Sequence, residues 1–222
     1  MSRMLLLLVG VAAQKTSCSH ATFEDYAVNM TAQWSPIDHV LLNGSGFNEI
    51  VIDAPVDGVN HATLFDSSVT DSQDPDLHTD DQYNVLIIQE DPATKPWKRV
   101  WEPNDRATGG TLHFDLREAA FGPAVSVRSL RLIDIDWYEA NSSVTLYDKN
   151  MTLLTRVAVA DQFDESDLEN GNVLELDLGV AEVGFMDVLL THSGAVDDII
   201  VCTTNNTNTT QGEGDGVTGD PH

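Results

Sequence analysis

Short runs of apolar and β-branched residues, separated by Gly, Asn, Asp and Pro, recur along most of this chain. Several runs alternate apolar with polar residues, which is the period of a β-strand, and few follow the spacing of a helix. About eleven such runs predict an all-β protein built as a sandwich of two antiparallel sheets. The expected strands are Ala21–Tyr26, Glu49–Ile52, Ala62–Phe65, Asn84–Gln89, Gly110–Asp115, Val125–Ile135, Ser143–Tyr147, Leu153–Val159, Val173–Leu178, Gly184–Leu190 and Ala195–Val201.

The two ends of the chain differ in composition from this strand-rich middle. Residues 1–13 combine a basic start, a short apolar run and a small-residue cleavage site, which predicts a secretory signal peptide. Residues 203–222 are rich in Thr, Asn and Gly, so we expect a disordered tail or a linker there. One domain over residues 18–202 is therefore expected, and no later run approaches the ~20 apolar residues of a membrane-spanning helix.

The chain has two cysteines, Cys18 and Cys202, which bracket almost all of the expected strands. In an oxidising compartment they would form a disulfide. That bond requires the first and last strands to lie side by side, as they commonly do at one edge of a sandwich. Acceptor sequences for N-glycosylation also favour secretion, and they occur at Asn29, Asn43, Asn141, Asn150, Asn205 and Asn208.

The chain is strongly acidic, with 36 Asp and Glu against 11 Lys and Arg and a formal charge of −25. This charge argues against nucleic acid or an anionic membrane as a partner, because both are polyanions. Cations are the natural partners, and the alternative is an acidic surface that serves only solubility.

Four clusters of carboxylates fall at the expected ends of strands. Calcium suits them, because it takes roughly six to eight oxygen ligands in a loose geometry that separate loops can supply. No EF-hand pattern is present, so the ligands would have to converge from distant segments. The candidate metal ligands are Glu24, Asp66, Asp74, Asp76, Asp134, Asp136, Asp197 and Asp198.

Strand parity adds detail to two of these clusters. In the run LIDID, Asp134 and Asp136 lie on one face of the expected strand, where they can share an ion or simply face water. Asp197 and Asp198 are adjacent, so one of them faces inward unless a bulge intervenes. A buried carboxylate needs a cation or hydrogen-bond donors, which favours a metal at this pair.

A series of short motifs occurs in a fixed order: FE, LFDSS, DPDL, NVLIIQED, GGTLHFDL, SLRLIDID, VTLYDKN and SGAVDDI. The series resembles a family of secreted jelly-roll domains of bacterial and algal extracellular proteins, over roughly Thr22 to Val201. The resemblance implies a jelly-roll β-sandwich without a settled activity. Acidic positions of that family are matched by Asp66, Asp74, Asp76, Asp134 and Asp136, for which we infer a role as ligands.

A more distant similarity connects the early FE and the late DD with calcium-stabilised jelly-roll carbohydrate-binding modules of the galactose-binding-like fold. It implies a structural calcium held by Glu24, Asp197 and Asp198. The chain departs from the bacterial family before DPDL, where SSVTDSQ replaces a more glycine-rich turn.

Carbohydrate binding needs aromatic surfaces as well as polar groups, because a sugar ring stacks on Trp or Tyr. Trp97 and Trp101, in the segment KPWKRVWEP, are the candidate ligand-binding residues and lie beside the main local basic patch. The alternative is that these tryptophans cover one end of the sandwich.

The function expected from the sequence is that of a secreted, calcium-binding, non-catalytic module for extracellular carbohydrate binding or adhesion. One alternative is a structural module of a cell-surface or matrix protein, and another is a glycoside hydrolase that uses two carboxylates. No nucleophile elbow occurs, and the histidines lack metal-ligand spacing, so no catalytic residue is expected. Calcium is the expected cofactor, and the expected partner is an extracellular carbohydrate or a matrix or cell-surface protein.

Overall fold

The strands of this chain follow the predicted order closely. In a computed structural model, the residues described are 15–24, 51–53, 62–68, 75–88, 105–117, 125–136, 141–163 and 172–205. The strands are β1 (Lys15–Ala21), β2 (Val51–Asp53), β3 (Ala62–Asp66), β4 (Asn84–Ile88), β5 (Gly110–Asp115), β6 (Val125–Ile133), β7 (Ser143–Tyr147), β8 (Leu153–Ala158), β9 (Val173–Val183), β10 (Phe185–Leu190) and β11 (Ala195–Asn205). Two short 3-10 turns, η1 (Pro75–Leu77) and η3 (Val159–Asp161), complete the described elements. Within these ranges no helix has the length and apolar character to span a membrane.

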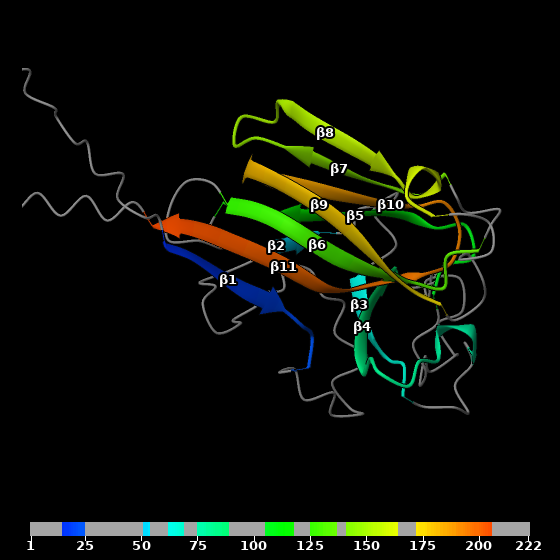
Figure 1. The fold of residues 1–222 in the computed structure, drawn as a ribbon. Coiled ribbons are helices and arrows are strands. Elements are labelled where there is room, and N and C mark those ends of the chain that lie inside the picture. Colours follow the sequence, from blue (N-terminus) through cyan, green and yellow to red (C-terminus); the bar gives the residue numbers. More distant parts are fainter. Residues whose placement is uncertain are drawn as a thin grey trace, which may run out of the picture.

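The strands form two antiparallel sheets that lie one over the other (Figure 1). The six-stranded sheet has the order β3-β4-β11-β6-β9, with β1 also paired to β11, and the five-stranded sheet has the order β2-β5-β10-β7-β8. Alternate residues of both sheets meet in one core, to which β5 contributes Leu112 and Phe114 and β6 contributes Leu130 and Leu132. The predicted all-β sandwich of two antiparallel sheets is confirmed.

β11 is an inner strand of the six-stranded sheet and changes its partner along its length. On one side it pairs with β6. On the other side Ala195 and Val196 pair with β4, whereas residues 199–205 pair with β1. Where the partner changes, the register with β6 is irregular, and Asp198 takes a φ of 46°. At Asp197 and Asp198, β11 therefore has β6 on one side and the ends of β1 and β4 on the other.

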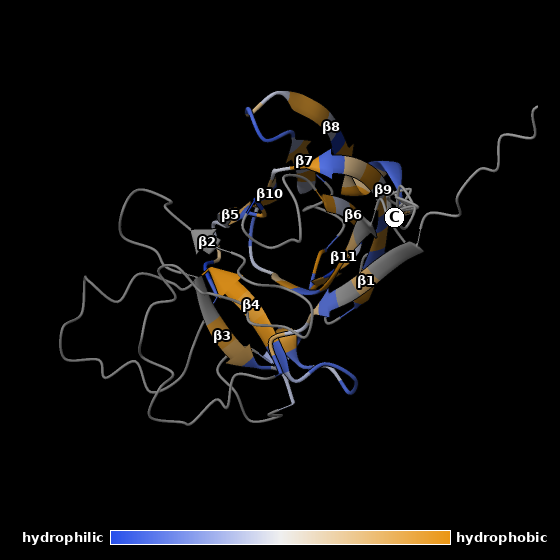
Figure 2. Ribbon diagram, turned by 90° about the vertical axis from the view of Figure 1, so that its left-hand side faces the viewer, coloured by the Kyte–Doolittle hydropathy of each residue, from blue (hydrophilic) through white to orange (hydrophobic). Residues whose placement is uncertain are grey.

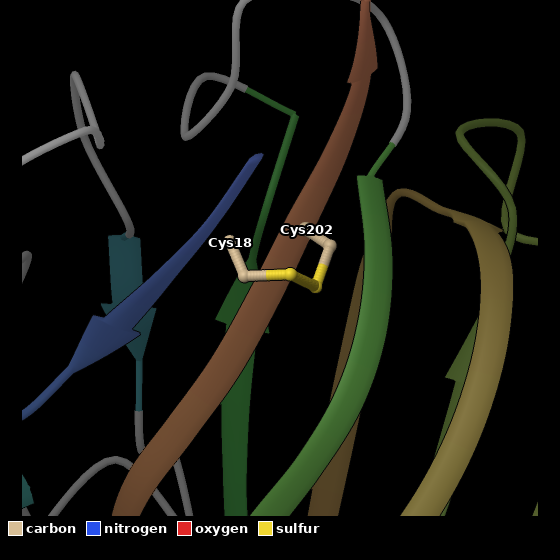
Figure 3. Close-up of a disulfide and its surroundings, with 2 residues drawn as sticks. All are labelled: Cys18 and Cys202. Atoms are coloured by element: carbon tan, nitrogen blue, oxygen red, sulfur yellow. A yellow bond between two sulfur atoms is a disulfide. The ribbon is translucent and has the colours of Figure 1, made fainter. Parts of the chain in front are cut away.

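A disulfide joins β1 to β11 (Figure 3). Cys18 and Cys202 are directly opposite each other in the antiparallel ladder and are bonded across a sequence separation of 184 residues. The predicted pairing of the two cysteines is confirmed. In the chain-entropy model, closing so long a loop stabilises the folded state by about 5 kcal/mol.

β4 is buried on both of its faces. Leu86 and Ile88 belong to the main core, whereas Val85 and Ile87 belong to a second cluster on the outer side of the six-stranded sheet. Leu77 of η1 completes this second cluster and is 0% exposed. Burial on both sides explains why Asn84 is followed by four apolar residues in the run NVLII, and Figure 2 shows β4 as a largely hydrophobic strand.

Several predicted strand boundaries differ from the structure, among them the end of β9, which lies at Val183 instead of Leu178. Two of the differences have a clear physical reason. The sequence predicts a strand at Ala21–Tyr26, whereas β1 ends at Ala21 and begins earlier, because its partner is the polar end of β11. The sequence also predicts that the strand from Val125 continues to Ile135. β6 stops at Ile133, because Asp134 takes the left-handed φ of 59°. The predicted signal peptide lies outside the described residues, and residues 203–205 of the predicted tail belong to β11.

Candidate functional site

Glu24 connects the segment after β1 to the start of β4. Its Oε1 accepts hydrogen bonds from the backbone N–H groups of Tyr83 and Asn84, at 3.3 and 3.2 Å. The side-chain amide of Asn84 donates in return to the backbone carbonyl of Phe23, at 3.1 Å. These contacts place a carboxylate at the point where β1, β4 and β11 meet.

Asp197 of β11 lies at the same junction and is 2% exposed. Burial, helped by the negative charges of Asp198 and Glu24, raises the pKa of the Asp197 carboxyl from 3.8 to about 7. A backbone hydrogen bond from Asp198 and the charge of Arg131 act in the opposite direction without cancelling the effect. A carboxylate in this environment is stabilised by either a proton or a cation.

Asp198 points away from this buried carboxyl. Its Oδ2 lies 2.7 Å from Nη1 of Arg131 on β6, and its side chain is 21% exposed. The left-handed backbone at Asp198 accompanies the irregular register of β11 at this point. Of the adjacent acidic pair, Asp197 is therefore the inward residue and Asp198 forms a surface ion pair.

Hydroxyl groups hold the acidic segment between β3 and β4 in place. Ser67 Oγ lies 3.0 Å from Thr79 Oγ1 and donates to the Gln82 carbonyl at 2.6 Å, and Thr79 Oγ1 accepts from the Gln82 N–H at 3.1 Å. All three residues are buried. This network brings η1, and with it Leu77, onto the sheet.

The candidate ligands of this acidic region that the structure describes, Asp66 and Asp76, do not contact a common partner. Asp66 Oδ1 accepts hydrogen bonds from the N–H and the hydroxyl of Ser68, at 3.1 and 2.6 Å. Asp76 lies in η1, where its Oδ1 is buried and receives no hydrogen bond from the described residues. Asp74 lies outside the described residues.

Asp134 follows β6 and is 3% exposed. Its backbone N–H donates to the carbonyl of Asn172 at 3.1 Å, and its Oδ2 accepts from the Ser193 hydroxyl at 3.4 Å. Because β6 ends at Ile133, the parity that would align Asp134 with Asp136 on one strand face does not apply.

Nowhere in the described ranges do three His, Cys, Asp or Glu side chains group closely enough to hold a metal ion by themselves. The structure brings Glu24 and Asp197 within electrostatic reach of each other and directs Asp198 to Arg131. The remaining described candidates do not form such a group: Asp66, Asp76, Asp134 and Asp136.

Two other sets of predicted residues are placed only in part. Trp97 and Trp101 lie outside the described residues, as do Asn29, Asn43 and Asn208. Of the remaining glycosylation candidates, Asn141 and Asn150 are exposed in turns on either side of β7, and Asn205 ends β11.

The outer face of the five-stranded sheet carries a group of polar and aromatic side chains that the sequence analysis did not select. Leu112 and Phe114 point inward, so His113 and Asp115 between and beyond them point outward. Across the sheet, Asp187 is registered with His113, and Phe185 lies between Asp115 and Tyr147. We call the six residues His113, Asp115, Arg117, Tyr147, Phe185 and Asp187 the polar sheet face.

Direct contacts join these residues in pairs. His113 Nδ1 lies 2.5 Å from Asp187 Oδ1, and its ring stacks on Phe185 with centroids 5.6 Å apart. Arg117 donates from Nε and Nη2 to the two carboxylate oxygens of Asp115, at 2.9 and 2.6 Å. The guanidinium carbon of Arg117 lies 4.4 Å from the centroid of the Phe185 ring.

The contacts on the polar sheet face shift the pKa values of Asp115 and Tyr147. The side-chain hydrogen bond from Arg117 lowers the pKa of Asp115, against a smaller opposing effect of burial. Burial raises the pKa of Tyr147, and the charge of Asp187 together with its hydrogen bond to the phenol raises it further. Asp115 is therefore an ionised acceptor and Tyr147 a neutral hydroxyl at neutral pH.

A signal for the polar sheet face is present in the sequence. GTLHFDLR places His113, Asp115 and Arg117 at every second position, and FMDVLL does the same for Phe185 and Asp187. Such a period indicates one face of each strand. It does not show which strands are neighbours, so the contacts across β5, β10 and β7 could not be read from it.

Comparison with protein-family models and with curated proteins gives no match. One solved structure, described as CpGH89CBM32-6 produced by Clostridium perfringens, matches with 12% sequence identity and a TM-score of 0.29. The match covers 46% of this chain and 74% of that chain. A likeness of this size supports no inference about function.

Proposed function

We propose that this protein is a secreted, non-catalytic β-sandwich module that binds a structural calcium ion and an extracellular carbohydrate. The observation that carries the proposal is the junction of β1, β4 and β11, where Asp197 is buried beside Glu24. The secreted location is supported by the disulfide between Cys18 and Cys202, since such bonds persist in oxidising compartments.

The donor chemistry at this junction fits calcium. Glu24 and Asp197 supply carboxylate oxygens, and calcium commonly completes its shell with backbone carbonyls and water. A bound divalent cation would neutralise the two like charges whose mutual repulsion contributes to the raised pKa of Asp197. Glu24 is itself oriented by two backbone N–H groups of the segment that opens β4.

Calcium titration into chelated protein tests this assignment. At a calcium concentration about 100 times Kd, binding to the folded state alone would stabilise it by about 2.7 kcal/mol. In a domain of this size, that raises the thermal midpoint by roughly 5–10 °C. Asp197→Asn should abolish the rise, whereas Asp161→Asn, at an exposed carboxylate of η3, should retain it.

A midpoint that does not move with calcium, or one that moves equally in Asp197→Asn, would contradict the calcium assignment. Asp198→Asn gives a second comparison. Because Asp198 is engaged by Arg131, we expect it to keep most of the calcium response.

The carbohydrate part of the proposal is supported by the polar sheet face and by the tryptophan segment of the sequence. Tyr147 provides a half-buried aromatic ring, and Arg117 with Asp187 provides a donor and an acceptor near it, over the buried ring of Phe185. A glycan array of the calcium-loaded protein tests binding. Release of no reducing sugar from a polysaccharide panel is expected of a non-catalytic module, and sustained hydrolysis would contradict it.

A further inference from the structure

The polar sheet face is held rigid by its own contacts. Arg117 is fixed by a two-point ion pair with Asp115 and by stacking on Phe185, so its long side chain has few rotamers left to lose. Rotamer freedom that is already lost before binding does not have to be lost on binding. A ligand would therefore meet donors and acceptors that are already oriented.

These groups are also accessible. Side-chain exposure is 48% for Arg117, 31% for His113 and 25% for Asp187, whereas the Phe185 ring beneath them is 7% exposed. Asp187 occupies the centre, since it accepts from His113 on one neighbouring strand and from the Tyr147 phenol on the other. The face thus presents polar edges over an aromatic floor, without a large exposed apolar area.

Among the side chains that the structure describes on this face, two carboxylates are matched by two arginines, whereas the whole chain has a large acidic excess. Asp115 and Asp187 are matched by Arg117 and by Arg156, which lies on β8 and donates from Nε to Ser143 at 3.2 Å. The chain carries a formal charge of −25, so an anionic ligand would be repelled at long range. It would also have to compete with Asp115 for a guanidinium that is already neutralised. Charge complementarity therefore favours a neutral ligand.

Sugar hydroxyls match this set of groups. Each hydroxyl donates one hydrogen bond and accepts others, and neighbouring hydroxyls can address a carboxylate and a guanidinium that lie side by side. Oriented polar groups beside aromatic side chains are typical of sites for small polar ligands. We propose that the polar sheet face binds a neutral oligosaccharide, with Arg117 as the donor and Asp187 as the central acceptor. This inference rests on the proposed carbohydrate-binding function and assigns it a place and a ligand class.

Binding of neutral oligosaccharides of glucose, mannose, galactose and xylose to the full chain, measured by titration calorimetry, tests the inference. At least one should bind, and Arg117→Ala and Asp187→Asn should each weaken it about tenfold, which corresponds to about 1.4 kcal/mol. Arg128→Ala is the matched control, because Arg128 is an exposed arginine on β6 of the other sheet. It should change the affinity less than twofold, and the thermal midpoint of every variant should stay within about 4 °C of the native value.

Three results would overturn the inference, and they separate it from the proposed function. Binding that is lost in Trp97→Ala or Trp101→Ala but unchanged in Arg117→Ala would place the ligand elsewhere while the carbohydrate function stands. Binding of oligogalacturonate alone would refute the neutral ligand class. Binding of no oligosaccharide would refute the inference together with the carbohydrate function, whereas the calcium-dependent midpoint would still test the calcium site on its own.

Discussion

The two sheets of this sandwich share one core but differ on their outer sides. On the six-stranded sheet, Leu77 covers a second apolar cluster, and a disulfide joins β1 to β11. On the five-stranded sheet, the outer side exposes charged groups, with Arg117 and His113 at 48% and 31% side-chain exposure. The outer side of the six-stranded sheet is thus covered in part by apolar packing, whereas that of the five-stranded sheet carries the polar sheet face.

The two sheets differ in the same way in β4 and β5, each of which is the second strand in the order of its sheet. β4 reads NVLII and is buried at every position, whereas β5 reads GTLHFD and alternates. A strand buried on both faces loses stability when either side is truncated, but a half-exposed strand tolerates changes on its outer side. Stability and the proposed carbohydrate binding should therefore respond to substitutions in different sheets.

The largest effect is expected from the disulfide of the six-stranded sheet. Replacing Cys18 and Cys202 together by Ser should cost about 5 kcal/mol, because the unfolded chain regains the entropy of an open loop of 184 residues. Scanning calorimetry should show a midpoint lower by roughly 10–20 °C. Reduced native protein is the control and should show the same loss. A midpoint within a few degrees of the native value would mean that the β1–β11 ladder holds without its covalent bond.

The next effect is a pH dependence at Asp197. The folded-state pKa is raised from 3.8 to about 7, so the protonated carboxyl stabilises the metal-free fold below pH 3.8, and this stabilisation is lost as the pH rises through 7. The loss amounts to as much as about 4 kcal/mol. Chelated Asp197→Asn should lack it and be more stable than the native protein at pH 8. Equal slopes of stability against pH in the two proteins would contradict the buried, charge-crowded placement of this carboxyl.

A smaller loss is expected from the second apolar cluster. Leu77→Ala should destabilise the protein by about 3 kcal/mol, because it removes the side chain that covers Val85 and Ile87 and leaves a cavity. Leu153→Ala is the matched control, since Leu153 is 58% exposed on β8. Denaturant unfolding measures both. Similar losses in the two variants would remove the contrast between a closed and an open sheet.

The smallest effect on stability is expected on the polar sheet face. Arg117→Ala should cost less than about 1 kcal/mol, because its ion pair with Asp115 is partly exposed to water. The same denaturant experiment measures it, at constant salt. A loss as large as that of Leu77→Ala would mean that the five-stranded sheet depends on its outer side for stability, and not only for binding.

Most of the strands could be predicted from the sequence, because their apolar residues repeat with the period of the element. β5 and β7 have the predicted bounds. The polar part of the β1–β11 ladder could not be predicted. Residues 15–21 and the last residues of β11, up to Asn205, are in strands because they pair with each other. Such pairing between distant segments leaves no local pattern of hydrophobicity.

The candidate site was predictable in smaller part. Adjacency indicated that one residue of Asp197 and Asp198 would face inward, and the structure buries Asp197. The strand on which Asp134 and Asp136 were expected to share a face ends at Ile133, because Asp134 itself takes a left-handed backbone conformation. Backbone breaks of this kind depend on the tertiary setting, so parity rules hold only as far as the strand itself continues.

The register of the β1–β11 ladder also determines how this module would respond to tension. Lys15 is paired with Asn205 at the open end of the ladder, and this pair and the next two precede the pair formed by Cys18 and Cys202. A pull applied between the two ends of the ladder strands would separate those pairs and then act on a covalent bond. The 184-residue span between the cysteines would carry no load, so both sheets and the polar sheet face would stay folded while the module is stretched.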